Sequence, residues 1–257
     1  MIASRLNDSQ CSRVKQKAVQ PLLPRKVAVV TGGNRGIGLA IARALIAEGS
    51  NVLISARDAS RLQRVARKIS TSRAEAVPLV CDVRDPEAVE RMFVALKERF
   101  GRLDVLVNNA GIIHANLSVA NLPVESWREV IATNLTGMYL VTRAALPLMK
   151  RGGAIVNNLS IAAERVFPGS SAYNASKHGA LGFTNTLREE LRGQGIRVIA
   201  LLPGATDTAL WTALWPDAPR RKMMSPSTVA QAVVRALSLP LESTLEELRI
   251  LPRAGAL

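Results

Sequence analysis

Residues 26–49, KVAVVTGGNRGIGLAIARALIAEG, hold a continuous apolar run, a glycine-rich turn and then a helical pattern. An apolar run without alternation predicts a strand that is buried on both faces. Gly32 and Gly36 allow the backbone to turn and to approach a pyrophosphate, while Gly38 allows the following helix to lie close to the strand. The free N–H groups at the start of that helix favour an anion. The stretch therefore predicts the first strand and helix of a dinucleotide-binding fold.

Strand and helix patterns alternate along the rest of the chain. Further apolar strand patterns occur at residues 51–57, 76–83, 103–111, 153–160, 195–204 and 247–251, and helical patterns separate most of them. A long helical pattern covers residues 127–152. The count and the alternation predict the α/β class, with a doubly wound, mostly parallel sheet of about seven strands and helices on both faces.

Residues 26–257 are expected to form one domain, because neither an internal repeat nor a linker divides them. Residues 1–25 are polar and basic, and we interpret them as a flexible extension, a mis-assigned start or, less readily, a transit segment. The chain has no secretory signal pattern and no apolar run of about 18 residues, so we expect a cytoplasmic protein without a membrane partner. The cysteines, Cys11 and Cys81, and two histidines provide neither a disulfide framework nor a metal-ligand cluster.

The formal net charge of +14 raises the question of nucleic-acid binding. Residues 1–26 carry +5 of this charge, and the remainder is spread along the chain, mostly as arginine in helical patterns. No aromatic residues are interleaved with these charges, and no nucleic-acid-binding motif is present. Solvated basic surfaces are therefore the better interpretation, and we expect no nucleic-acid partner.

Tyr173 and Lys177 are four residues apart in a helical pattern, so they share one helix face. A neighbouring ammonium stabilises a phenolate, and lowering a phenol pKa by about three units requires about 4 kcal/mol. Ser160, at the end of an apolar run, can donate a hydrogen bond to the same substrate oxygen that Tyr173 protonates. The three residues outline a proton-transfer site, although a surface pair of Tyr and Lys on an amphipathic helix remains an alternative.

Several further motifs accompany this pair in a characteristic order. TGGNRGIG lies at residues 31–38, NNAG at 108–111, TNLTG around Asn134, and PGATDT at 203–208. In order and spacing the chain resembles the short-chain dehydrogenase/reductase family, from about Lys26 to Gly255. The resemblance implies a Rossmann-type fold and a catalytic tetrad of Asn134, Ser160, Tyr173 and Lys177. In that tetrad Asn134 kinks a helix and holds a water that links the lysine to solvent.

The resemblance also implies the residues that hold the cofactor. Asp82 would bond the adenine amino group while Asp85 caps the next helix, Asn108 would steady the central sheet, and Thr208 would lie at the nicotinamide carboxamide. The full set that the resemblance implies is Gly32, Asn34, Arg35, Gly36, Ile37, Gly38, Ser55, Arg57, Asp82, Val83, Asn109, Ala110, Gly111, Tyr173, Lys177, Pro203, Gly204, Thr206 and Thr208.

The strand at residues 51–57 favours NADP(H) over NAD(H). Ala56 stands where NAD-preferring members of the family usually have Asp, and Arg57 follows it. Arg35 is a second cation able to bind a 2′-phosphate, and Ser55 is expected to add a hydroxyl. The alternative is that both arginines are ordinary solvated charges of a basic protein.

Two segments depart from the family pattern or carry less information. Leu159 replaces the small residue that usually precedes the catalytic serine. The segment at residues 211–224 is expected to form a mobile flap over the substrate. Its apolar residues line a pocket, join the core or contact another subunit; they are Trp211, Leu214, Trp215, Met223 and Met224.

The sequence thus predicts an NADP(H)-dependent ketoreductase, similar to 3-oxoacyl reductases, that moves hydride between nicotinamide and a carbonyl or secondary alcohol. We weigh it against an NAD-linked alcohol dehydrogenase and against a regulatory protein that binds the cofactor without turnover. The resemblance implies a homodimer or homotetramer. Steroids, sugars, 3-oxoacyl thioesters and small ketones all remain open as substrates, because the tetrad fixes the reaction and not its partner.

Overall fold

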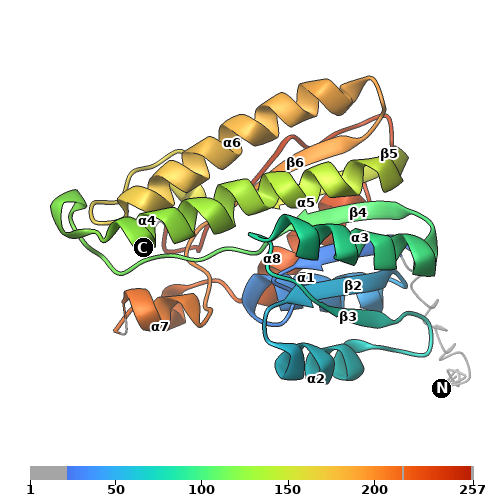
Figure 1. Ribbon diagram of the computed structural model, residues 1–257, viewed down its shortest axis with the longest axis horizontal. Helices are drawn as coiled ribbons and strands as arrows, with labels where there is room; N and C mark the ends of the chain where they lie inside the picture. Colours follow the sequence, from blue (N-terminus) through green and yellow to red (C-terminus); the bar gives the residue numbers. More distant parts are fainter. Residues whose placement is uncertain (1–21, 216, 256–257) are drawn as a thin grey trace, which may run out of the picture.

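The computed structural model describes residues 22–215 and 217–255, which form an α/β fold around one sheet of seven parallel strands (Figure 1). The strand order is β3-β2-β1-β4-β5-β6-β7, so the direction of winding reverses between β1 and β4. This confirms the predicted fold class. The strands are β1 (Val27–Thr31), β2 (Asn51–Ala56), β3 (Ala76–Val80), β4 (Leu103–Asn108), β5 (Met149–Asn158), β6 (Arg197–Pro203) and β7 (Glu247–Ile250).

Helices cover both faces of the sheet. One hydrophobic core joins the sheet to α1, α2 and α8, and a second joins it to α3, α5 and α6. None of the helices in the described ranges is long and apolar enough to cross a membrane. The helices are α1 (Gly36–Ala47), α2 (Ala59–Ile69), α3 (Pro86–Phe100), α4 (Val124–Ile131), α5 (Gly137–Ala145), α6 (Ser171–Arg192), α7 (Leu210–Leu214) and α8 (Pro226–Leu237), with short turns η1 (Val119–Asn121), η2 (Ala132–Thr136), η3 (Leu146–Leu148), η4 (Ile161–Ala163) and η5 (Arg220–Lys222).

The described chain contacts the domain slightly before Lys26. Leu23 is buried in the core beside α1, and its carbonyl oxygen accepts a hydrogen bond from the Ser50 hydroxyl. The backbone N–H of Arg25 donates to the carbonyl of Gly49. The boundary expected at Lys26 therefore lies a few residues earlier, and the rest of the proposed extension, residues 1–21, lies outside the described residues.

The long helical pattern at residues 127–152 is not one helix. It forms α4, a π-helical turn η2 and α5, and the helix ends at Ala145. Pro147 follows in η3, and β5 begins at Met149. The helix ends there because proline has no N–H to continue the hydrogen-bond ladder. The π-helical turn places Asn134 inside the protein, where it is fully buried.

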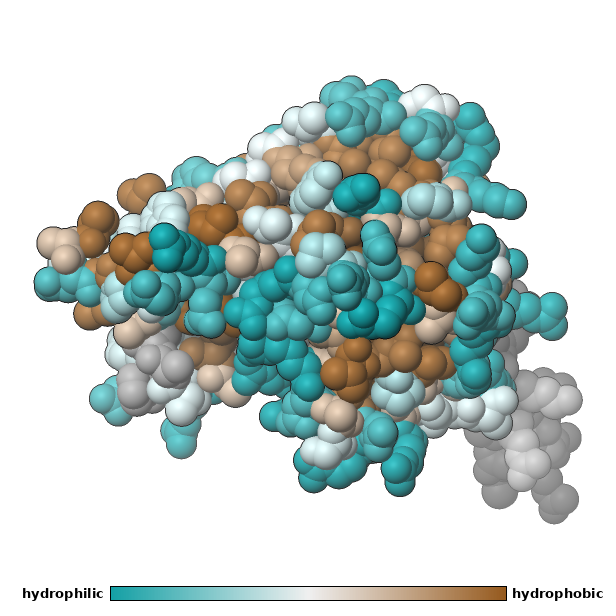
Figure 2. Space-filling model, in the orientation of Figure 1, coloured by the Kyte–Doolittle hydropathy of each residue, from teal (hydrophilic) through white to brown (hydrophobic). Residues whose placement is uncertain are grey.

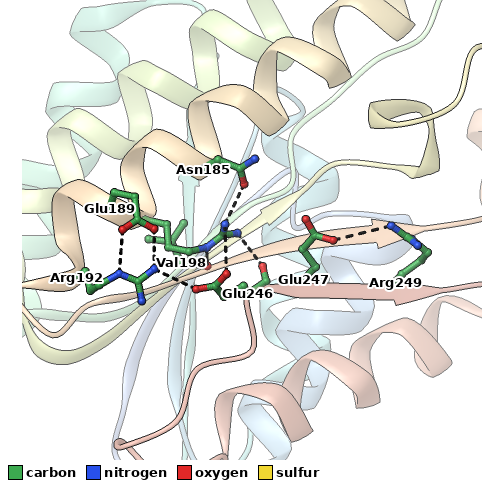
Figure 3. Close-up of polar contacts among 8 residues, drawn as sticks. Asn185, Glu189, Arg192, Val198, Glu246, Glu247 and Arg249 are labelled. Atoms are coloured by element: carbon green, nitrogen blue, oxygen red, sulfur yellow. Dashed lines mark hydrogen bonds and ion pairs between the residues drawn. The ribbon is translucent and has the colours of Figure 1, made fainter.

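The far end of α6 is anchored to the edge of the sheet by Arg188, which is 8% exposed. Its Nε donates to the carbonyl of Val198 at 3.1 Å and its Nη2 to the carbonyl of Glu246 at 2.8 Å, while its Nη1 donates to Asn185 Oδ1. Figure 3 shows these partners on α6, β6 and the segment that enters β7. Helix α6 is therefore fixed to β6 and to the segment that enters β7, at the end opposite to Tyr173.

Candidate active site

A cleft of about 930 Å³ opens at the carboxyl ends of the central strands, where the strand order reverses. Ligands in open α/β sheets bind at this position. Of the nineteen residues expected to hold the cofactor, all except Gly38 and Ser55 line it. Ser160 lines it as well, between the end of β5 and the turn η4. The topology thus brings the glycine turn and the Tyr-Lys pair into one site, as the sequence motifs predict.

The glycine turn is shaped by close contacts between backbone segments. Gly32 and Gly36 have φ values of 64° and 55°, which side chains with a Cβ rarely adopt. A Cβ at Gly38 would collide with the Asn109 side chain and with the carbonyl of Gly32, so Gly38 serves the expected close approach of α1 to the sheet. Asn109 Nδ2 also donates to the carbonyl of Thr31 at 2.8 Å, which fixes β4 against β1.

Ser55 does not reach the cleft, and this part of the prediction is wrong. The residue is fully buried in β2, and its hydroxyl has no hydrogen-bond partner among the described residues. Because side chains alternate along a strand, Ala56 and not Ser55 faces the cleft.

Three arginines, Arg35, Arg57 and Arg61, line the end of the cleft beside β2 and α2. All three are exposed, and none forms an ion pair with a residue in the described part of the chain. Asp58 lies between them, but its carboxylate caps α2 by accepting from the backbone N–H of Arg61 at 2.9 Å. These arginines are therefore available for a phosphate.

Asp82 lines the cleft but is not free, contrary to expectation. The Arg84 guanidinium holds its carboxylate, with Nε 3.0 Å from Oδ1 and Nη2 2.6 Å from Oδ2. This hydrogen bond to Arg84 lowers the pKa of Asp82. The Asp85 side chain caps α3 as predicted, by accepting from the backbone N–H of Glu87. The sequence did not reveal that Arg84 would turn back onto the carboxylate two residues before it.

At the opposite end of the cleft, Tyr173 and Lys177 lie one turn apart in α6. The Lys177 Nζ is 5.6 Å from the centroid of the Tyr173 ring and donates to the carbonyl of Asn158 at 3.0 Å. Ser160 follows β5, and its hydroxyl accepts from the backbone N–H of Ala162 at 3.1 Å. The Ser160 and Tyr173 side chains both line the cleft, and interaction with Ser160 acts to lower the pKa of Tyr173. The Ser, Tyr and Lys of the predicted tetrad therefore converge.

Burial controls the protonation of both residues on α6. It raises the pKa of Tyr173, and the interaction with Ser160 opposes this shift without overcoming it. Burial also lowers the pKa of Lys177 to about 8. The expectation that Lys177 lowers the pKa of Tyr173 is thus not met in the protein alone, because removal from water disfavours the charged forms of both groups.

Asn134 reaches the site indirectly, through the loop that follows β4. Its Oδ1 accepts from the backbone N–H of Ile112 at 2.9 Å, and its Nδ2 donates to the carbonyl of the same residue at 2.9 Å and to Ser176 Oγ at 3.0 Å. Ser176 in turn donates to the carbonyl of Tyr173 at 2.7 Å. Asn134 itself does not line the cleft. Its predicted kink is present as the π-helical turn, a form that is frequent at functional sites.

Sequence reasoning missed a buried chain of polar groups beneath the catalytic residues. Asn108 Nδ2 donates to Thr142 Oγ1 at 2.9 Å and to Asn157 Oδ1 at 2.8 Å. Asn157 Nδ2 donates to Thr184 Oγ1 at 2.9 Å, so the chain joins α5, β4, β5 and α6. Polar residues in a central strand are the available signal, because a buried amide requires partners. This chain steadies the sheet, as expected for Asn108.

The segment expected to form a flap contains α7, and only part of it faces the cleft. Trp211 and Trp215 line the cleft, whereas Met224 is buried in the core beside α8, and Met223 is not in the lining. The side chain of Leu214 lies outside what the structure describes. Leu159, the departure from the family pattern, is buried and contributes to the cleft wall.

The residues present fit a dinucleotide. The glycine turn leaves room for a backbone-bound pyrophosphate, the arginines stand free at one end, and the Asn158 Oδ1 in the cleft wall is buried without a hydrogen-bond partner in the described residues. Within the same residues, no three His, Cys, Asp or Glu side chains gather as metal ligands would. Burial raises the pKa of the Cys81 thiol in this wall to about 11, so the thiol stays protonated at neutral pH.

The fold and the cleft together define a dinucleotide-binding α/β oxidoreductase. The family model described as short chain dehydrogenase matches residues 26–219, and the chain belongs to this family. An uncharacterised oxidoreductase of Staphylococcus aureus (strain USA300) is 34% identical over 233 residues, which cover 90% of this chain and 99% of the relative.

Two solved structures show the same fold with different cofactors. An alcohol dehydrogenase from the archaeon Thermococcus sibiricus, complexed with 5-hydroxy-NADP, is 34% identical with a TM-score of 0.82, over 88% of this chain and 96% of that one. A 3-ketoacyl-(acyl-carrier-protein) reductase from Brucella melitensis, complexed with NADH, is 31% identical with a TM-score of 0.81. The match covers 89% of this chain and 97% of that one. Likeness alone therefore supports a nicotinamide dinucleotide without choosing between the two forms.

Proposed function

We propose that the protein is an NADP(H)-dependent carbonyl reductase in which Tyr173 is the general acid. The observation that carries this proposal is the convergence of Ser160, Tyr173 and Lys177 at one end of a cleft whose other end is lined by unpaired arginines. In the oxidative direction Tyr173 acts as the general base on a secondary alcohol.

A reduced nicotinamide cofactor held by the glycine turn and the arginines would supply the hydride for the carbonyl carbon. As the C–H bond forms and the C=O π bond breaks, negative charge develops on the carbonyl oxygen. The Ser160 hydroxyl donates a hydrogen bond to that oxygen, and the Tyr173 O–H transfers its proton to it. Because burial raises the pKa of Tyr173, the phenol is protonated at neutral pH and ready to act as an acid.

Lys177 returns a proton to the Tyr173 phenolate after each reduction. A lysine whose pKa is about 8 both holds and releases a proton near neutral pH, which an ordinary exposed lysine does not. Its hydrogen bond to the carbonyl of Asn158 fixes the ammonium beside the tyrosine ring. The nearby π-helical turn with Asn134 is the proposed route by which solvent protons reach Lys177.

The preference for NADP(H) rests on three residues. Arg35 and Arg57 are exposed at the cleft, without ion pairs to described residues, and a phosphate binds such side chains by charge-assisted hydrogen bonds. Ala56 lines the cleft where an acidic side chain would repel a 2′-phosphate and bind a ribose hydroxyl.

The test is a comparison of NADPH and NADH oxidation by the purified protein with a panel of ketones, aldehydes and keto esters. The proposal predicts turnover of at least one carbonyl compound and a higher kcat/KM for NADPH than for NADH. Equal use of both cofactors would contradict the cofactor assignment and leave the reaction type standing. Tight cofactor binding without turnover of any carbonyl compound or alcohol would favour the regulatory alternative.

A further inference from the structure

The part of the cleft beyond Tyr173 is lined almost entirely by uncharged side chains. We call it the substrate half, and it consists of the lining residues within 112–116, 159–173 and 209–215. All charged lining residues apart from Lys177 belong to the arginine end of the cleft, with Asp58 and Asp82. The apolar members of the substrate half include Ile113, Leu159, Ile161, Phe167, Trp211 and Trp215.

Two tryptophans form one wall of the substrate half. The Trp211 Nε1 donates to the carbonyl of Thr206 at 2.8 Å, and its ring lies edge to face with Trp215, at 6.4 Å between centroids and an interplanar angle of 63°. Trp215 is 45% exposed. An indole left that open beside a cleft offers a large apolar surface that a ligand can cover.

Arg220 holds this wall in place. Its Nη1 donates to the carbonyl of Thr208 at 2.9 Å and its Nη2 to Thr212 Oγ1 at 2.9 Å, so η5 is tied to α7 and to the segment before it. The same guanidinium forms an ion pair with Asp207 at 2.6 Å. Its charge is therefore already compensated and is not available to an anionic substrate.

Another part of the lining comes from two loops that are tied together. The backbone N–H of Leu117 donates to the carbonyl of Gly169 at 3.0 Å, and the Asn116 side chain lies against Gly169 so closely that a Cβ there would collide with it. Phe167 extends this part of the lining, beside Val166, which is 77% exposed. Figure 2 shows hydrophobic side chains gathered at the end of the molecule where α4 begins.

These observations point to an uncharged, apolar substrate. A carboxylate moved from water into this half of the cleft would lose its hydration without gaining a free cation. An apolar ring would instead remove its own surface and the two indoles from water. We propose that the substrate is an uncharged carbonyl compound whose carbonyl group is attached to an apolar ring that lies against Trp211 and Trp215. This inference rests on the proposed function.

A matched pair of ketones tests the charge requirement. Methyl 4-acetylbenzoate and 4-acetylbenzoate share one aromatic ketone and differ in a remote negative charge, and 2-butanone serves as a small reference. With NADPH, we expect kcat/KM for the ester to exceed that for the acid by about 30-fold or more. Equal or faster reduction of the acid, or reduction of 2-butanone alone, would overturn the inference while the proposed function stands. If none of the three consumes NADPH while another carbonyl compound of the panel does, the inference falls and the proposed function stands; if no compound of the panel is reduced, both fall.

A second comparison tests whether the aromatic ring of the substrate contacts the two tryptophans. Trp211→Ala should lower kcat/KM for the ester about tenfold, with little change for 2-butanone and for the Kd of NADPH. Trp127→Ala, at a 41% exposed position on α4 outside the cleft lining, is the matched control and should change neither rate. Trp215→Ala gives the same test if Trp211→Ala fails to fold. Unchanged ester reduction in both cleft variants would overturn the proposed contact.

Discussion

The two ends of the cleft use polar side chains in opposite ways. At the catalytic end Lys177 and Asn134 are buried, and each is hydrogen-bonded to backbone groups of the strands or loops around it. At the other end Arg35 and Arg57 are exposed and form no ion pair with described residues. Buried polar groups require internal partners, so the catalytic end is already ordered by the protein, whereas the exposed cations keep their charge for a ligand. We infer that the first end determines the reaction and the second the cofactor.

The largest expected effect is on turnover, at the catalytic end. Tyr173→Phe removes the proton donor and keeps the ring, and we expect kcat to fall by about 10³-fold, within the usual range for loss of a general acid. The Kd of NADPH should change less than about threefold. Steady-state kinetics and fluorescence titration of NADPH provide the two values. A variant that retains a tenth of the wild-type kcat would show that Tyr173 is not the acid.

The next effect is on the stability of the helix that carries Tyr173. Arg188→Met removes three hydrogen bonds of a buried guanidinium, and we expect a loss of about 2–4 kcal/mol in the free energy of unfolding. Arg192→Met is the control on the same helix, because its ion pairs with Glu189 and Glu246 are exposed and screened by solvent, so their loss should change the free energy of unfolding little. Urea unfolding measures both. Equal losses would mean that the anchor in Figure 3 does not stabilise α6.

At the arginine end the expected effect is on binding alone. Arg57→Ala should raise the Kd of NADPH by about 10- to 100-fold, the value of a charge-assisted hydrogen bond, and leave the Kd of NADH within about threefold. Arg67→Ala removes another exposed arginine of the same basic surface, on α2 but outside the cleft lining. Calorimetric titration of both cofactors distinguishes a specific contact from a general charge effect. An equal loss of NADPH affinity in Arg57→Ala and Arg67→Ala would indicate a general charge effect and not a specific contact.

The smallest expected effect is a pH dependence. Burial lowers the pKa of Lys177 from 10.5 to about 8, so the reductive kcat should decline as pH rises above about 8, when the ammonium is lost. The folded protein then binds fewer protons than the unfolded chain between about pH 8 and 10.5, so this group makes unfolding less favourable as pH rises through that window. Arg57→Ala should show the same profile, because Arg57 lies at the other end. A profile flat to pH 10 would contradict the role of Lys177.

The sequence predicted the sheet and most of the lining of the cleft, because these depend on local patterns. The glycine turn, the apolar strands and the spacing of Tyr173 and Lys177 each specify their own geometry. The sequence did not predict that Ser55 faces away from the cleft or that the Arg84 guanidinium binds the Asp82 carboxylate. Both depend on the direction of side chains in neighbouring segments. The helix expected through residue 152 ends early at a proline that the apolar periodicity concealed.

The direction in which the pKa of Tyr173 shifts could not be predicted from the sequence either. Four-residue spacing places Lys177 beside Tyr173, but whether charge or burial dominates depends on how deeply α6 is covered. The buried chain from Thr142 to Thr184 likewise requires the three-dimensional neighbours of each amide. Arg188 is not distinguishable by sequence from the exposed arginines around it.

The division of roles between the two ends is tested most directly by single-turnover reduction. Wild type and Arg57→Ala, each saturated with NADPH, are mixed with a carbonyl substrate, and the rate constant of NADPH oxidation is measured by stopped flow. If the arginine end only selects the cofactor, the two rate constants will agree within about threefold, although the variant needs more NADPH to reach saturation. A fall of tenfold or more at saturation would contradict the account, because Arg57 would then act on the chemical step.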